Sequence, residues 1–173
     1  MEVVTWRKRL RKRRPAATRR PSGLAGLTPT VSKSRVCKPV LQRLDEALSA
    51  GGASYDELVS IEHVLPQTVE TGSEWEDLFP DEAVREEWTH RLANLVFLTR
   101  RINTRASNWD FETKKEKYFQ SEDGTSPFPL TQGVLMTDAW TLDHLKQRQK
   151  QLIGVLCKVW ELEVVDSEAL VTA

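Results

Sequence analysis

The stretch Ser60-Ile61-Glu62-His63-Val64-Leu65-Pro66-Gln67, together with the later run Asn94-Leu95-Val96-Phe97-Leu98-Thr99, decides the fold of this chain. The segment 59–64 predicts a β-strand that ends before the proline, because proline interrupts a hydrogen-bonded ladder. The segment 94–99 predicts a second strand, and its consecutive apolar residues predict burial on both faces. A polar helix or turn is expected over 100–105, and a helix over 110–119. Strand, long connection, strand and helix is the order of a ββα finger.

Further helices are expected around this unit. A helix over 39–50 should end at a Gly-Gly pair and carry one apolar face, formed by Val40, Leu41, Leu44 and Leu48. In the acidic connection 71–90, Pro80-Asp81-Glu82 resembles a helix start. Thr141 is the expected N-cap of a long last helix, 142–162, whose apolar residues recur at helical spacing. The predicted fold class is α+β, a mostly helical domain around a small ββα core.

The chain combines a basic arm with an acidic body. Lys and Arg total 25 and Asp and Glu total 25, yet basic residues crowd the start: Arg7, Lys8, Arg9, Arg11, Lys12, Arg13, Arg14, Arg19 and Arg20. We expect 1–35 to be a disordered basic arm, 36–162 a folded domain and 163–173 a tail. The arm has two interpretations, salt-sensitive contact with nucleic-acid phosphates or a solvated tail.

Apolar stretches in this sequence are too short for a signal-peptide core or a membrane span, so a soluble cytoplasmic protein is expected. Cys37 and Cys157 lie far apart and the three histidines show no paired spacing, which excludes a structural zinc site of the usual kind. Both cysteines are expected to be buried thiols rather than a disulfide.

The polar residues that end or follow the two runs suggest a one-metal nuclease site. Cutting a phosphodiester needs a base that works near neutral pH, and imidazole has the appropriate pKa, so His63 is the candidate base. The reaction also needs a cation that offsets the charge developing at the phosphate. Carboxylate and amide oxygens suit Mg²⁺ or Mn²⁺, so Glu62 and Asn103 are the candidate metal ligands.

Each of these residues has a structural alternative. A strand histidine is often a structural residue, Asn103 could form a turn, and Glu62 could pair with a nearby arginine. Neighbouring residues in a regular strand point to opposite faces, so Glu62 and His63 share one site only where the strand twists or ends. His90 is expected at an exposed helix end, with a place in the site as the alternative. His144 is expected on a solvated helix face.

A second basic cluster, near the second strand and the helix after it, is expected to bind phosphates: Arg100, Arg101, Arg105, Lys114, Lys115 and Lys117. Asn108 is expected to support the site or to contact the nucleic acid. The tryptophans from Trp75 onward are expected in the core, with stacking on an extruded base as the alternative.

A resemblance to a known family covers roughly 36–162 and is carried by Ile61-Glu62-His63-Val64-Leu65-Pro66-Gln67, His90-Arg91-Leu92-Ala93-Asn94-Leu95, Asn103, Asn108, Phe111, Lys114, Tyr118, Trp140 and Arg148. This pattern resembles the C-terminal nuclease domain of GmrSD-type modification-dependent restriction enzymes, which belongs to the HNH, or His-Me finger, superfamily. The resemblance implies a metal-dependent endonuclease that cuts double-stranded DNA, with or without modified bases, in restriction or phage defence. It implies a catalytic set of His63, Asn94 and Asn103. In this set Asn94 would hold the loop that carries the histidine through side-chain hydrogen bonds.

Two departures from the family pattern matter. Ala93 stands where a glycine commonly precedes the asparagine, which disturbs the turn only if positive φ is needed there. The nucleotide-hydrolysing domain typical of the family has no counterpart, since the sequence holds no Gly-x-x-x-x-Gly-Lys loop. A separate nucleotide-hydrolysing subunit, a fragment of a longer protein and a nuclease that acts alone all fit this observation.

The sequence therefore leaves two functional hypotheses of different class. The first is a metal-dependent DNA endonuclease. The second is a catalytically inactive DNA-binding or assembly subunit that retains the HNH fold. Cleavage of RNA is a third and more distant alternative.

Overall fold

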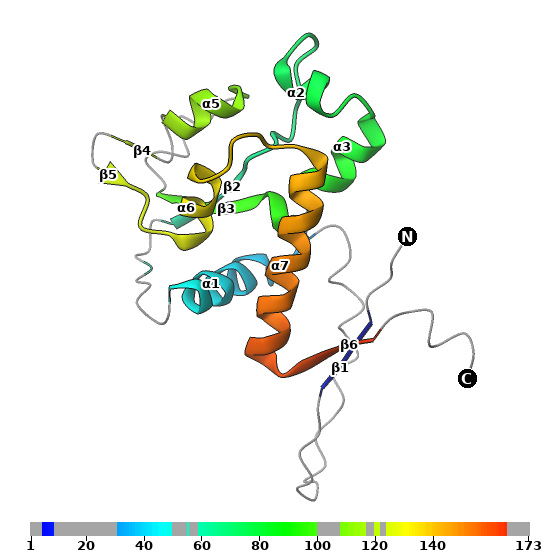
Figure 1. The fold of residues 1–173 in the computed structure, drawn as a ribbon, viewed down its shortest axis with the longest axis vertical. Coiled ribbons are helices and arrows are strands. Elements are labelled where there is room, and N and C mark those ends of the chain that lie inside the picture. Colours follow the sequence, from blue (N-terminus) through cyan, green and yellow to red (C-terminus); the bar gives the residue numbers. More distant parts are fainter. Residues whose placement is uncertain are drawn as a thin grey trace, which may run out of the picture.

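Helices make up most of the described chain, and the strands form short antiparallel pairs (Figure 1). The computed structural model describes residues 5–8, 31–49, 55, 59–99, 108–116, 120–121 and 124–165. The elements follow in the order β1 (Thr5–Lys8), η1 (Val31–Lys33), α1 (Cys37–Leu48), β2 (Val59–His63), α2 (Glu74–Leu78), α3 (Glu82–Thr89), η2 (Leu92–Asn94), β3 (Leu95–Thr99), α5 (Phe111–Lys114), β4 (Gln120–Ser121), β5 (Gly124–Thr125), α6 (Pro129–Leu135), α7 (Leu142–Trp160) and β6 (Leu162–Val165). The predicted α+β, mostly helical fold class is confirmed.

Strand β3 lies at the centre of the molecule, paired with β2 and buried on both faces. The two strands run antiparallel, with Ile61 opposite Phe97 and His63 opposite Leu95. Side chains alternate across a strand, so Val96 and Leu98 join one apolar cluster while Leu95 and Phe97 join another. The predicted burial of this run is confirmed.

The first cluster is built mainly from the long connection between β2 and β3. It holds Val64, Leu65, Trp75, Phe79 and Trp88, together with residues from β3, α5 and the C-terminal part of the chain. The large aromatic rings bury the most apolar surface and fix α2 and α3 against the strand pair. The predicted core position of the tryptophans is confirmed for those in this cluster.

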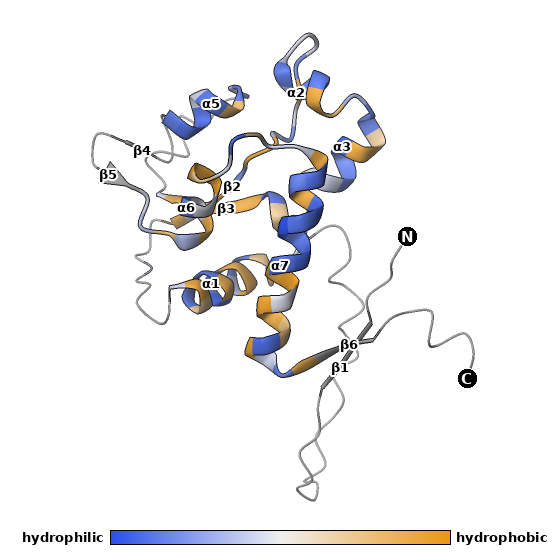
Figure 2. Ribbon diagram, viewed as in Figure 1, coloured by the Kyte–Doolittle hydropathy of each residue, from blue (hydrophilic) through white to orange (hydrophobic). Residues whose placement is uncertain are grey.

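The second cluster joins α1 and α7 on the other side of β3. It contains Leu41 and Leu44 from α1 and Leu152 and Leu156 from α7. Figure 2 shows that the apolar part of α7 is the half beside α1. Leu48, predicted on the inward face of α1, is instead 44% exposed, because it occupies the last turn of the helix.

Two helix starts follow from capping chemistry read in the sequence. The Asp81 side chain accepts hydrogen bonds from Ala83 N and Val84 N, and α3 begins at Glu82. The Thr141 hydroxyl accepts a bond from His144 N at 3.3 Å, and α7 begins at Leu142. The predicted helix start at 80–82 and the predicted Thr141 cap are confirmed.

Other expectations are met only in part or lie outside the described residues. Within the range 1–35, expected to be disordered or loosely ordered, the structure describes β1, which pairs with β6, and η1; residues 1–4 and 9–30 lie outside the described residues, so the order of that part of the arm stays a prediction. Of the helix expected over 110–119, the structure describes an α-helix from Phe111 to Lys114 and π geometry at 115 and 116, whereas 117–119 lie outside the described residues. Helix α6, at the end of the expected 121–129 loop, was not predicted.

Strands β2 and β3 supply two elements of the expected ββα finger. The segment 100–107 that follows β3 lies outside the described residues, so the complete finger stays a prediction. No helix in the described part of the chain has the length and apolar character to cross a membrane. Cys37 and Cys157 are both free thiols, the first buried and the second half-buried.

Candidate functional site

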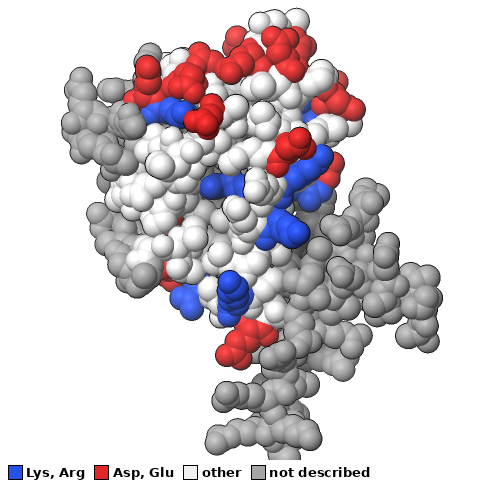
Figure 3. All heavy atoms as spheres, viewed as in Figure 1, with Lys and Arg blue, Asp and Glu red and all other residues white. Residues whose placement is uncertain are grey.

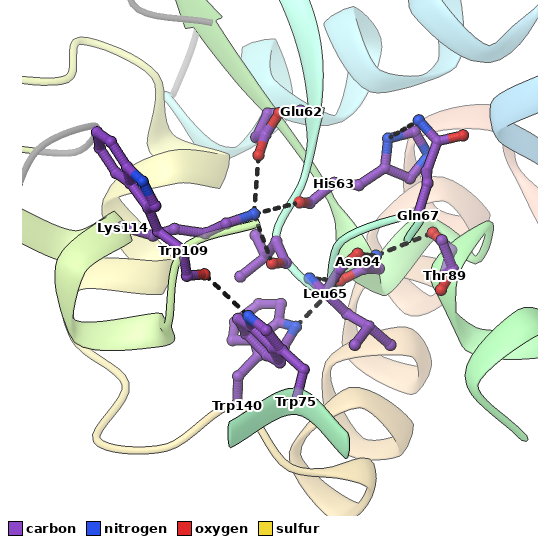
Figure 4. A network of polar contacts seen from close by, with 11 residues as sticks. Glu62, His63, Leu65, Gln67, Trp75, Thr89, Asn94, Trp109, Lys114 and Trp140 are labelled. Atoms are coloured by element: carbon purple, nitrogen blue, oxygen red, sulfur yellow. Dashed lines mark hydrogen bonds and ion pairs between the residues drawn. The ribbon is translucent and has the colours of Figure 1, made fainter. Parts of the chain in front are cut away.

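His63 is the last residue of β2, and its ring lies beside a second imidazole (Figure 4). The rings of His63 and His90 meet edge to face, with their centroids 5.6 Å apart and their planes at 88°. His63 Nδ1 lies 3.4 Å from the side-chain nitrogen of Gln67, a long contact. His63 Nε2 is buried and has no hydrogen-bond partner among the described residues. The imidazole therefore keeps a nitrogen that no described group occupies.

The surroundings of this imidazole favour its neutral form. Burial lowers the pKa of His63 to about 4, and the nearby His90 and Lys114 lower it in the same direction. Burial in an apolar site disfavours the charged form, and a neighbouring cation repels it. At neutral pH the ring is therefore uncharged and can accept a proton.

Asn94 holds the turn that follows His63. The side chain is fully buried, and its Oδ1 accepts hydrogen bonds from Leu65 N at 2.7 Å and from the Trp140 indole at 3.1 Å. Its Nδ2 donates to the carbonyls of Leu65 and Thr89, each at 2.9 Å. One amide thus satisfies four partners and joins the β2 turn, the end of α3 and the segment before α7 (Figure 4).

A buried ion pair lies on the other side of β2. Lys114 Nζ donates to Glu62 Oε1 at 3.0 Å and also to the backbone carbonyls of His63 and Val64, each at 2.9 Å. The lysine side chain is 1% exposed and the glutamate side chain 11%. Burial lowers the pKa of Lys114, while the charge and the hydrogen bond of Glu62 act to raise it.

Glu62 and His63 leave β2 in different directions. In Figure 4 the carboxylate points to Lys114, whereas the imidazole points across the strand toward Gln67. This is the alternation expected of a regular strand, and the strand end does not bring the two groups together. The carboxylate has a lysine partner, whereas the structural alternative considered from the sequence was an arginine. Within the described residues, no group of three or more His, Cys, Asp or Glu side chains could hold a metal ion.

The predicted phosphate-binding residues fall into two sets. Arg100, Arg101, Arg105 and Lys117 lie outside the described residues, as does Asn103, the predicted metal ligand. The predicted phosphate contact of Lys114 is not supported by its position, because this ammonium group is buried and uses its three hydrogens inside the protein. The neighbouring Lys115 is partly exposed and contacts Glu112 and the Thr137 carbonyl. Asn108 is half-buried.

Two other histidines differ from expectation. His90, expected at an exposed helix end, does cap α3 but is only 8% exposed, and its Nδ1 lies 2.7 Å from the Ser32 hydroxyl. Its edge-to-face contact places it beside His63, which was the alternative considered. His144, expected on a solvated face, is half-buried, and its ring centroid lies 4.9 Å from that of Trp140.

Helix α7 contributes polar support that the sequence reasoning did not identify. Gln149 Oε1 accepts a hydrogen bond from Ala93 N at 2.8 Å, and Arg148 Nε donates to the Ala93 carbonyl at 3.0 Å. Both side chains are buried. They interrupt the apolar face of α7 between Leu145 and Leu152, and polar residues on such a face indicate a buried hydrogen-bonding role.

Charge is distributed unevenly over the surface. In the view of Figure 3, acidic side chains gather over the end of the molecule formed by α2 and α3. Basic side chains lie mainly lower in this view, where α7 runs.

Comparison with known proteins identifies the family. The family described as the C-terminal domain of GmrSD restriction endonucleases matches residues 23–155, which include His63, Asn94 and Lys114. The searches of curated proteins and of solved structures returned no significant match. The match covers well over half of the sequence, and the chain therefore belongs to the family of GmrSD restriction endonuclease C-terminal domains.

Proposed function

We propose that this protein is a metal-dependent endonuclease that hydrolyses DNA phosphodiester bonds, with His63 as the general base. Membership of a family of restriction endonucleases supports nuclease activity on DNA in a restriction or phage-defence system. The observation that carries the residue assignment is the place of His63 at the end of β2, beside His90 and directly before the turn that the Asn94 side chain holds.

The proposed role of His63 is to take a proton from the water that attacks the phosphorus. A neutral imidazole has one nitrogen that accepts a proton. The Gln67 amide nitrogen can only donate to Nδ1, and at 3.4 Å this contact is too long to fix the tautomer, so Nε2 can serve as the accepting nitrogen. The negative charge of a bound phosphodiester would favour the imidazolium form and raise the pKa of the base while substrate is present. Asn94 supports the reaction indirectly, by fixing the turn that carries the ring.

The proposal includes a metal ion, Mg²⁺ or Mn²⁺, for which the described residues supply few ligands. Glu62 was the expected carboxylate ligand, but Lys114 binds it and it points away from the imidazole. The described residues alone do not form a ligand set for a hard divalent ion. Metal dependence is therefore proposed from the family and from Asn103.

DNA binding is proposed to use Arg100, Arg101, Arg105, Lys115 and Lys117, which neutralise phosphate charge without reading sequence. Lys114 is removed from this set because of its burial. A separate nucleotide-hydrolysing subunit is one proposed partner, and the alternatives are a longer chain that carries this domain and a nuclease that acts alone.

Nicking of supercoiled plasmid with Mg²⁺ or Mn²⁺ tests the proposal. His63→Ala should slow nicking by about 10²-fold or more and leave DNA affinity unchanged, since general bases typically contribute 10²–10⁴-fold. His144→Ala is the matched control, because it removes another half-buried histidine, whose ring packs against Trp140. EDTA should abolish nicking by the wild type. Equal nicking by wild type and His63→Ala would exclude His63 as the base.

A second function is favoured by the Glu62–Lys114 pair. Glu62, one of the two expected metal ligands, is paired with the buried Lys114. Such a pair fits a catalytically inactive DNA-binding or assembly subunit that retains the fold. In that case the wild type binds DNA but nicks it with neither metal ion. The same assay on RNA tests the third possibility.

A further inference from the structure

We propose that Lys114 is a positioning residue, which binds the backbone at the end of β2 and thereby fixes the direction in which His63 projects. The inference rests on the proposed function of His63 as the base. It replaces the phosphate contact predicted for this lysine with a role inside the protein.

All three hydrogens of the Lys114 ammonium group form hydrogen bonds inside the protein. The three acceptors lie at 2.9–3.0 Å: Glu62 Oε1, His63 O and Val64 O. These acceptors belong to three consecutive residues at the point where β2 ends. A lysine that binds a phosphate keeps its ammonium group in solvent, whereas this residue is 1% exposed.

The backbone beyond β2 needs such partners because its pairing with β3 ends at His63 and Leu95. A buried carbonyl without a hydrogen bond is costly, and Pro66 supplies no N–H to extend the ladder. Lys114 binds the carbonyls of His63 and Val64, while Val64 N donates to Asn94 O at 3.0 Å.

Asn94 completes the arrangement from the opposite side. Its side chain binds both backbone groups of Leu65, so the turn 63–65 is held by α5 through Lys114 and by η2 through Asn94. Figure 4 shows the two side chains approaching this turn from different elements. A reacting group is effective only when its geometry is fixed, and misplacement by about 1 Å can cost about 10²-fold in rate.

Glu62 has a defined place in this arrangement. It is the counter-ion that offsets the burial of the ammonium group, so that Lys114 keeps three donors. Replacing Lys114 alone would leave the buried Glu62 carboxylate without its partner. Replacing both residues by uncharged ones leaves no buried charge unpaired. The informative variant is therefore the double substitution Glu62→Gln with Lys114→Met.

The first experiment compares plasmid nicking and DNA affinity for three variants. We expect Glu62→Gln/Lys114→Met to lower kcat by about 10²-fold while the Kd for DNA and its salt dependence stay unchanged. Lys115→Met should show the opposite pattern, a weaker Kd with a salt slope reduced by about 1. Lys146→Met, on the exposed face of α7, is the control that should change neither quantity.

The second experiment does not depend on activity. Hydrogen exchange at the amides of Val64 and Leu65 should become at least about tenfold faster in the double variant and stay unchanged in Lys146→Met, because the turn has lost one of its two supports. Measurement well below the melting temperature of each variant separates local opening from global unfolding.

Three results would overturn the inference: unchanged exchange in the double variant, unchanged kcat, or a weaker Kd with a reduced salt slope. A failure of the proposed function looks different. If wild type and His63→Ala nick equally, His63 is not the base, and the exchange experiment still decides whether Lys114 holds the turn.

Discussion

The side-chain amide of Asn94 forms the same pair of hydrogen bonds with Leu65 that one strand residue forms with another. Oδ1 accepts from Leu65 N at 2.7 Å, and Nδ2 donates to Leu65 O at 2.9 Å. An amide side chain thus extends the pairing of β2 and β3 beyond Val64, whose N–H donates to the backbone carbonyl of Asn94. Geometry at the proposed base therefore depends on a residue that need not contact the substrate.

Replacement of Asn94 should be among the most destabilising substitutions in the chain. Asn94→Ala would leave Leu65 N, Leu65 O, Thr89 O and the Trp140 indole without their partner in a buried site. Each unsatisfied buried group costs about 1–3 kcal/mol, so we expect a loss of about 3 kcal/mol or more in urea denaturation. Exposed Gln67→Ala is the control and should stay within about 0.5 kcal/mol. Comparable losses for the two variants would contradict the prediction.

Stability should fall as the pH is lowered from about 6.5 to 4. Burial lowers the pKa of His63 to about 4 in the folded protein, whereas an unfolded histidine titrates near 6.5. Between these values the unfolded chain binds a proton that the folded chain does not, so the free energy of unfolding decreases with pH, by about 3 kcal/mol for His63. The pKa values of His90 and His144 are also lowered and act in the same direction.

Urea denaturation at several pH values measures this dependence, and NMR titration of the imidazole gives the pKa directly. His63→Gln should flatten the decline, and His90→Gln should raise the pKa of His63 because a neighbouring positive charge is removed. An identical pH dependence for wild type and His63→Gln would show that another group is responsible.

Two glycines in helices should respond in opposite ways to alanine. At Gly133 in α6 an added Cβ would lie 3.1 Å from a guanidinium nitrogen of Arg148, whose other nitrogens are held by the carbonyls of Ala93 and Leu130. At Gly154 in α7 nothing lies within 4 Å of the added atom.

We therefore expect Gly154→Ala to stabilise the protein by about 0.5–1 kcal/mol, the usual gain in a helix interior. Gly133→Ala should lose that gain and destabilise the protein, because the guanidinium cannot move without breaking its hydrogen bonds. Thermal unfolding of the two variants measures the difference, and stabilisation by Gly133→Ala would refute the argument.

Glycine should improve the end of α7. Glu161 has a left-handed backbone, with φ 51° and ψ 45°, and its N–H binds the last carbonyls of the helix. This conformation costs a residue with a Cβ about 1 kcal/mol, so Glu161→Gly should raise the stability by about that amount. Glu161→Ala keeps the Cβ and serves as the matched control. A gain from alanine equal to that from glycine would point to the charge rather than the backbone.

The parts of the fold that were predictable depend on local chemistry. The helix start at 80–82, the Thr141 cap and the apolar run of β3 each carry their signal within a few residues, and the structure confirms all three. Helix α6 was not predicted because it lacks a capping side chain before Pro129 and because Gly133 lowers helix propensity.

The arrangement around His63 was predictable only in part. The pattern pointed to His63 and Asn94, but the partner of Glu62 is Lys114, far along the chain, and a lysine in a basic cluster gives no sign of burial. His90 reaches the site because Ser32 and His63 pack on it, contacts that span many residues. Such contacts form only when separate elements come together, and periodicity in one segment does not encode them.

The connection from 64 to 94 leaves the strand pair and returns to it at nearly the same point. Leu65 near its start is hydrogen-bonded to Asn94 at its end. The intervening α2 and α3 therefore form a long insertion whose two ends are held together. The entropy of closing a loop rises only slowly with its length. The length of this insertion can therefore differ between relatives while Leu65 and Asn94 at its two ends keep their pairing.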